Sequence, residues 1–228
     1  MNEFLDNPVY HALTSGNSSK ARGSENVKYF DPEVSPFAGI KDGYQKGFEE
    51  LFENLTPGRR ILYASRKDLP AHEGWKLILS IAGRQFLYLP KEGFTSDFSE
   101  LAPLNTTNVE EMIALAKLTK PGPFDGRTIE FGNYHGIFKD GKLVAMAGRR
   151  LHVYGYMEIS AVCTHPAHLG KGYAASLLKH QVNSILEEGM VPFLHVRADN
   201  IRAIELYERL GFAGNGPMNF YLLERIEG

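Results

Sequence analysis

The sequence predicts a mixed α/β (α+β) fold in which a mostly antiparallel sheet is flanked by helices. Three observations in the second half of the chain support this prediction. Apolar segments with strand-like alternation are separated by longer segments with helical spacing. The dipeptide Asp140-Gly141 between two apolar runs favours a tight hairpin turn. A strand–helix–strand unit over about residues 156–197 predicts a parallel pair with a right-handed crossover.

The first half of the chain predicts a further α/β unit. Residues 42–55 place apolar side chains at helical spacing, and residues 59–65 have the pattern of a strand. Residues 75–90 predict two more strands, and we expect them to form a hairpin that turns at Ala82-Gly83.

A polar connector over residues 91–97 divides the two halves. We therefore expect an N-terminal domain of unassigned role over residues 1–95 and a second domain over residues 96–228. The second domain has a regular order of elements. In that order we predict a strand at 99–105, a helix at 106–122, a hairpin at 134–151, a strand at 155–164, a helix at 173–189, a strand at 191–198, a helix at 199–212 and a strand at 218–226.

Alternation along residues 155–164 predicts which side chains share a face of the sheet. We expect one face to carry Met157, Ile159, Ala161 and Cys163, and the other to carry Glu158, Ser160 and Val162. Cys163 is the only cysteine, so an intrachain disulfide is excluded. Because its predicted face is apolar and no triad pattern accompanies it, we expect this cysteine to pack in the core.

Composition and charge narrow the class of protein. The formal net charge is −2, so no global charge steers the chain to nucleic acid or to an anionic membrane. No apolar run approaches the roughly 20 residues needed to cross a bilayer. The first residues lack a basic region followed by an apolar one, which a secretion signal would require. We expect a soluble, cytoplasmic protein.

A small, basic loop precedes the helix predicted at 173–189. It reads THPAHLGKGYA, from Thr164 to Ala174. Gly170 and Gly172 let the backbone approach a ligand, and the free N–H groups of the following helix favour an anion such as a pyrophosphate. Lys171 adds a full positive charge. The loop matches neither a P-loop nor a dinucleotide fingerprint, so a plain strand-to-helix turn is the alternative.

Two motifs together resemble the GNAT superfamily of N-acetyltransferases. These are EISAVCTHPAHLGKGYAASLL and, further along the chain, NIRAIELYERLGF. The loop is similar to the acyl-CoA pyrophosphate loop of that superfamily: Gly172 and Ala174 match, and Leu169 stands where arginine or glutamine is usual. The resemblance covers about residues 96–228, and this half is most similar to the glycine N-acyltransferase-like branch.

The resemblance implies an N-acyltransferase that uses acetyl-CoA as acyl donor, with direct attack by an amine in a ternary complex and no metal. The backbone of Val162–Thr164 would pair with the pantetheine arm, and one of its N–H groups would polarise the thioester carbonyl. The residues expected to hold the donor are Val162, Cys163, Thr164, Leu169, Gly170, Lys171, Gly172, Tyr173, Ala174, Asn200, Arg202 and Ala203.

Two residues are candidates for proton transfer. Several GNAT enzymes have a glutamate at the position of Glu158, so it is our predicted general base, against the alternative of a solvated carboxylate at a strand edge. The resemblance also implies that Tyr207 is the general acid that protonates the leaving thiolate, and its ring can pack in the core at the same time. His135 and His152 are the alternative bases.

Other assignments complete the prediction. Asn200 is expected to cap the helix that follows it. His165 and His168 have H-x-x-H spacing but no third ligand motif, so we expect no metal there. The expected acceptor is a small-molecule amine, no nucleic acid or membrane partner is expected, and a homodimer is left open. The alternative function is a non-catalytic acyl-CoA-binding sensor.

Overall fold

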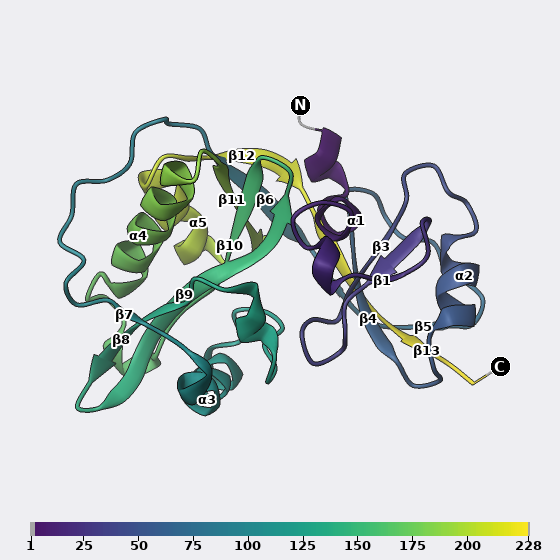
Figure 1. The fold of residues 1–228 in the computed structure, drawn as a ribbon, viewed down its shortest axis with the longest axis horizontal. Coiled ribbons are helices and arrows are strands. Elements are labelled where there is room, and N and C mark those ends of the chain that lie inside the picture. Colours follow the sequence, from purple (N-terminus) through teal and green to yellow (C-terminus); the bar gives the residue numbers. More distant parts are fainter. Residues whose placement is uncertain (1–2, 228) are drawn as a thin grey trace.

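The computed structural model describes residues 3–227, which form two sheets joined side by side (Figure 1). The first sheet has the strand order β1 (Arg22–Gly23), β2 (Val27–Tyr29), β3 (Phe37–Ile40), β4 (Arg60–Ser65), β13 (Asn219–Arg225) and β5 (Trp75–Ile81). The second has the order β12 (Phe212–Pro217), β6 (Gly83–Tyr88), β11 (Val191–Arg197), β10 (Tyr156–Thr164), β9 (Lys142–Val153), β8 (His135–Lys139) and β7 (Ala102–Pro103).

Within the described residues, five α-helices cover these sheets: α1 (Pro8–Leu13), α2 (Gly47–Asn54), α3 (Val109–Thr119), α4 (Tyr173–Glu187) and α5 (Ile201–Arg209). Helix α2 buries Phe48 and Leu51 against the first sheet. Helix α4 packs on β9, β10 and β11, and α5 packs on β12 (Figure 1). Helix α3 also contacts β9 and β10, but its apolar cluster is distinct from that of α4.

The second half of the chain contains the predicted helices and strands in the predicted order, with one strand that the sequence analysis did not predict, β12, between α5 and β13. Asp140 and Gly141 both have positive φ, 51° and 74°, as a two-residue hairpin turn between β8 and β9 requires. Asn200 caps α5 by accepting a hydrogen bond from the N–H of Ala203. Only β10–β11 and β3–β4 are parallel among the strand pairs of residues 3–227, so the predicted mixed, mostly antiparallel fold is confirmed.

The hairpin predicted at Ala82-Gly83 is wrong. Strand β5 pairs with β13 in the first sheet, whereas β6 pairs with β11 and β12 in the second. Neither Ala82 nor Gly83 has the positive φ that a two-residue hairpin turn needs, so the chain passes straight from one sheet to the other.

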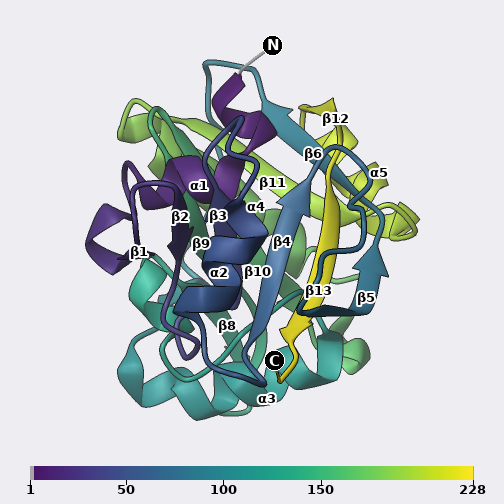
Figure 2. The ribbon, with the colours of Figure 1, turned by 90° about the vertical axis from the view of Figure 1, so that its right-hand side faces the viewer.

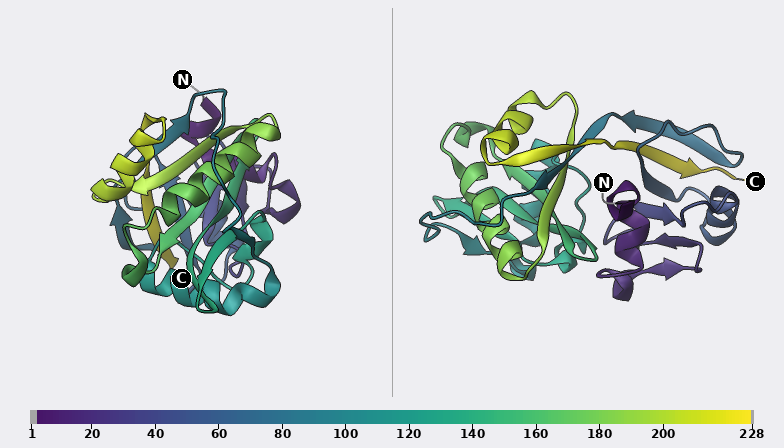
Figure 3. Two further views of the ribbon diagram at one scale, coloured as in Figure 1. Left: turned by 90° about the vertical axis from the view of Figure 1, so that its left-hand side faces the viewer. Right: turned by 90° about the horizontal axis from the view of Figure 1, so that it is seen from above.

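A second crossing strand runs beside the first. Met218 joins β12 to β13, and its N–H donates to the carbonyl of Gly83 at 3.0 Å. Seen from above, β5–β6 and β12–β13 form a two-stranded ribbon that spans both sheets (Figure 3), and Figure 2 shows β4, β13 and β5 side by side. The two sheets therefore do not separate at residue 95: β6 lies in the second sheet and the C-terminal strand lies in the first.

Within residues 3–227, no helix combines the length and the apolar composition that crossing a membrane would require.

Gly83 lies directly against the second crossing strand, and this gives a test of the topology. A Cβ at Gly83 would lie 2.5 Å from the carbonyl oxygen of Met218. We expect Gly83→Ala to lower the free energy of unfolding by about 1–3 kcal/mol through overpacking. Gly214→Ala on β12 is the matched control, because its Cβ would meet no atom within 4 Å. Denaturant titration of both variants measures the difference, and equal stability would contradict the crossing.

Candidate active site

Strands β10 and β11 begin as a parallel pair and then separate. They pair only from Tyr156–Val191 to Glu158–Phe193, although both strands continue beyond that point. The pairing of β10 with β9 shifts register between Ser160 and Cys163, and Ala161 has a φ of 53°. Such a bulge bends a strand and interrupts its ladder. The result is an opening in the second sheet beside the residues that follow Glu158.

The same bulge corrects the predicted faces of this strand. Ala161 and Cys163 pack in the cluster of α3, whereas Met157 and Ile159 pack in the cluster of α4. The single apolar face predicted from strict alternation is therefore wrong beyond Ile159, because one extra residue exchanges the two faces. The prediction that Cys163 packs in the core is confirmed: the side chain is buried, and burial raises the pKa of its thiol to about 11.

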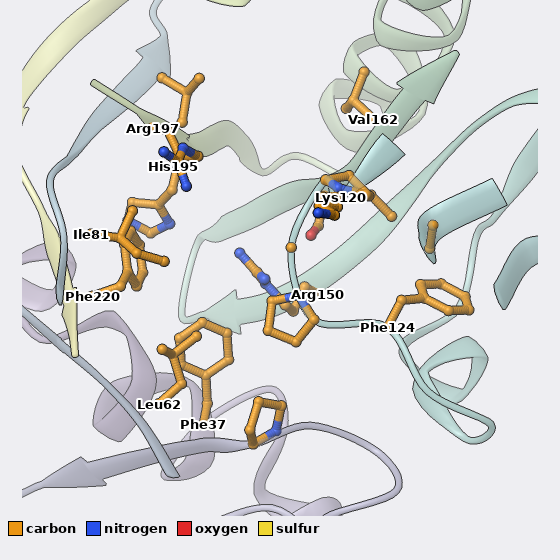
Figure 4. A pocket seen from close by; sticks show the side chains of 18 of the residues that line it. Phe37, Leu62, Ile81, Lys120, Phe124, Arg150, Val162, His195, Arg197 and Phe220 are labelled. Carbon is orange, nitrogen blue, oxygen red and sulfur yellow. The ribbon is translucent and has the colours of Figure 1, made fainter. Parts of the chain in front are cut away.

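A cavity of about 490 Å³ lies between the two sheets and reaches the opening in the second sheet (Figure 4). The first sheet contributes an apolar wall that includes Phe37, Leu62 and Phe220. The opposite side consists of residues 159–162 of β10 and residues 195–197 of β11. Lining residues come from both halves of the chain, so the cavity exists only because the sheets are joined.

Glu158 lies behind the lining of this cavity and is fully buried, with 0% of its side chain exposed. Arg150 binds it through two hydrogen bonds, from Nε to Oε2 at 2.8 Å and from Nη2 to Oε1 at 2.6 Å. The N–H of Leu151 also donates to Oε2, and Nδ1 of His195 lies 2.7 Å from Oε1. Burial by itself would raise the pKa of Glu158. The positive charge of Arg150, together with the hydrogen bonds from Arg150 and His195, instead lowers this pKa to about 2.

Gln85 determines which ring nitrogen of His195 carries the proton. The Oε1 of Gln85 accepts from Arg66, and its Nε2 donates to the carbonyl of Leu5, so the amide orientation is determined. Its Nε2 also lies 2.9 Å from Nε2 of His195. That histidine nitrogen must therefore accept, and the Nδ1–H must donate to Glu158. Both ring nitrogens of His195 are in use.

Tyr207 and Asn200 lie on the α5 side of the cavity and line it. The ring of Tyr207 is buried and packs near Phe86 and Phe212, as predicted for its apolar part. Its hydroxyl makes no hydrogen bond to another side chain or to the backbone within residues 3–227. Burial raises the pKa of Tyr207 to about 12, so the hydroxyl keeps its proton at neutral pH.

The predicted anion-binding loop leads into α4. Gly170 and Gly172 have φ of 81° and 80°, and a Cβ at either would meet no atom within 4 Å. Among the described residues, the backbone N–H groups of residues 170–175 have no acceptor. Thr164 Oγ1 and His168 Nδ1 are also buried without a partner in this part of the chain. An open run of unpaired donors at a helix N-terminus fits a phosphate-bearing ligand.

Several other residues predicted from the sequence do not line the cavity. Leu169, Lys171 and Arg202 are exposed, and the N–H of Ala203 is taken by the Asn200 cap. His135 packs against His180 of α4.

Neither His135 nor His152 lines the cavity. The backbone N–H of His152 instead donates to Asn17 in the N-terminal segment. His165 accepts from the N–H of Ala167 and so caps a short turn.

Sequence reasoning missed three residues that shape the cavity: Phe37, Arg150 and His195. A charged or titratable side chain inside an apolar strand segment was the available signal for Arg150 and His195. Phe37 had no such signal, because it is one apolar residue in a strand that the sequence pattern did not indicate.

Comparison with known proteins identifies the family to which this fold belongs. A family model described as FR47-like protein matches residues 134–217. A GNAT-family protein from Novosphingobium aromaticivorans has a crystal structure that is 33% identical to this chain, with a TM-score of 0.90, and the match covers 98% of this chain and 99% of that one. This chain therefore belongs to the GNAT family of acetyltransferases. No curated protein matches the chain.

Two more distant structures share the fold alone. A GCN5-related N-acetyltransferase from Kribbella flavida is 16% identical with a TM-score of 0.65, and the match covers 98% of this chain and 96% of that one. A GNAT-family acetyltransferase from Colwellia psychrerythraea is 13% identical with a TM-score of 0.53, covering 89% and 84%. The predicted resemblance to the GNAT superfamily is confirmed, and the assignment to the glycine N-acyltransferase-like branch stays a prediction.

Proposed function

We propose that this protein transfers the acetyl group of acetyl-CoA to the nitrogen of an amine, by direct attack in a ternary complex. The observation that carries the proposal is the opening between β10 and β11, which leads from the glycine loop side of the sheet to a cavity lined by Tyr207. An enzyme of this kind gains most from holding two substrates in contact and from donors placed where negative charge develops.

The residues present fit acetyl-CoA. The unpaired N–H groups of residues 170–175 would hold its diphosphate, and Lys171 would add charge. The backbone of Val162–Thr164, unpaired with β11, would bind the pantetheine arm, and Asn200 lies beside the same opening. When bound, acetyl-CoA supplies an activated acyl group.

Tyr207 is the residue we propose to donate a proton to the departing sulfur. Its hydroxyl keeps its proton at neutral pH because burial raises its pKa, and no protein acceptor within residues 3–227 competes for that proton. The hydroxyl lies on the side of the opening where the thioester would be held.

The predicted role of Glu158 as general base stays a prediction, and the geometry favours a different role. A carboxylate with a pKa of about 2 is a weak proton acceptor, and both of its oxygens already accept hydrogen bonds. We propose that the amine loses its proton to water in the cavity, and that Glu158 positions Arg150 and His195.

Two other sequence-based alternatives stay predictions. No observation favours the non-catalytic sensor. The edge strand β5 favours a homodimer, because its apolar side chain Leu77 is 53% exposed outside the cavity and its outer backbone edge has no partner within residues 3–227.

Gly172 tests the acyl-CoA loop. Gly172→Asp should lower the affinity for acetyl-CoA at least about tenfold, because the new carboxylate repels the diphosphate and blocks the backbone. Gly172→Asn is the matched control: asparagine has the same shape, tolerates the positive φ and carries no charge. Isothermal titration calorimetry should rank the affinities wild type, then Asn, then Asp. Equal affinities in all three folded proteins would remove the anion site.

Tyr207 tests the proton donor. Tyr207→Phe should bind acetyl-CoA almost normally and lower kcat by roughly 10²–10⁴-fold, as for the loss of a general acid. Tyr221→Phe, a buried tyrosine of β13 outside the cavity, controls for removal of a buried hydroxyl. Release of the CoA thiol with a panel of amines gives the rates. If Tyr207→Phe turns over as fast as Tyr221→Phe, the sulfur receives its proton from elsewhere.

A further inference from the structure

The apolar wall of the cavity favours an acceptor that carries an apolar group. Phe37, Leu62, Phe220 and Leu222 line it from the first sheet, and Phe124 lines it from the loop after α3 (Figure 4). Burying an aliphatic or aromatic group against such a wall is favourable because it removes apolar surface from water. A small, wholly polar acceptor would leave this surface uncovered.

The charges around the cavity are of one sign. Among the described residues, the charged side chains that line it are Lys117, Lys120, Arg150 and Arg197, and none is acidic. Arg197 is paired with Asp199, whereas Lys117 and Lys120 have no ion-pair partner within residues 3–227. An acceptor with several positive charges would meet no counter-charge here, and an acceptor with a negative group would meet a surplus of cations.

Arg150 supplies a rigid donor aimed into this cavity. Its side chain is nine-tenths buried, with 10% exposed. Nε and Nη2 are bound to Glu158, and the ring of Phe37 lies 4.8 Å from Cζ, so the guanidinium is held in place. Nη1 has no partner in the described part of the chain, and Figure 4 shows Arg150 pointing into the cavity. A fixed guanidinium with free N–H groups is suited to a carboxylate.

We propose that the acceptor is an amine that also carries a carboxylate and an apolar side group, that is, an apolar amino acid. Its carboxylate binds the free N–H groups of Arg150, its side group packs on Phe37 and Phe220, and its amino group faces the opening beside β10. Lys120, at the cavity wall, adds attraction for the carboxylate. This inference rests on the proposed function, which it deepens by naming the substrate class.

The test compares amino acids with their amides. Phenylalanine and phenylalaninamide share the amine and the side group and differ in the carboxylate; leucine and leucinamide form a second pair. Calorimetric titration in the presence of CoA should show at least one amino acid binding about tenfold or more tightly than its amide, as expected for a charge-assisted hydrogen bond. The tetraamine spermine should bind weakest. Amides that bind as tightly as the acids, or tight spermine binding, would overturn the inference.

Substitutions at Arg150 and Lys120 test where the carboxylate of the amino acid binds. Arg150→Lys keeps the charge beside Glu158 and removes the planar set of N–H donors that a guanidinium offers. The ratio of the affinity for the amino acid to that for its amide should therefore fall about tenfold. Should Arg150→Lys fail to fold, Lys120→Asn decides: asparagine tolerates the positive φ of 51°, and the acid-over-amide preference should fall by a smaller but measurable factor. Lys91→Asn, an exposed lysine outside the cavity, should leave the preference unchanged. An unchanged preference in Lys120→Asn and any folded Arg150→Lys would contradict the assignment.

Turnover separates this inference from the proposed function. Faster acetylation of the amides than of the acids would overturn the amino-acid assignment and leave the acetyltransferase standing. Intact acetyl-CoA with every amine, alongside a persistent binding preference for the acids, would contradict the acetyltransferase and support the carboxylate site.

Discussion

The ion pair between Arg150 and Glu158 is the interaction on which the rest of the cavity depends. A buried carboxylate is tolerated only when it is paired and fully hydrogen-bonded. Glu158 meets this condition with four donors, from Arg150, Leu151 and His195. The pair holds the guanidinium in one orientation and holds His195 in one tautomer. Both contacts require Glu158 to be ionised. Removing either partner would leave an uncompensated charge at the junction of the sheets.

The strand exchange explains how this network can form. Gln85 is on β6 and reaches His195 of β11, and Arg66, which directly follows β4 in the first sheet, donates to Gln85 because the ribbon β5–β6 passes from one sheet to the other. The N-terminal part of the chain therefore helps to build the cavity: it provides the apolar wall around Phe37 and the amide that orients His195. The cavity is therefore lined in part by residues outside the two motifs that resemble the GNAT superfamily.

The sequence predicted the elements that have local causes. The turn at Asp140-Gly141 and the cap at Asn200 each depend on residues adjacent in the chain, and both were correct. The partner of a strand is decided elsewhere, so the hairpin at Ala82-Gly83 was wrong. The bulge near Ala161 reversed the faces of β10 in a way that strict alternation cannot anticipate. The cavity residues were missed for the same reason: His195 acquires its role from Gln85, 110 residues away.

Measuring the pKa of Glu158 tests the buried Arg150–Glu158 network most directly. Carbon-13 NMR of glutamate-labelled protein, with the Glu158 carboxyl resonance assigned by its loss in Glu158→Gln, follows that single group. A folded-state pKa lowered to about 2 means that the ionised form is the stable one, and that its contribution to stability is lost only as pH falls from the ordinary value of 4.5 towards 2. We predict no titration of this resonance between about pH 3.5 and about pH 8. A midpoint within that range would contradict the network and would restore Glu158 as a candidate general base.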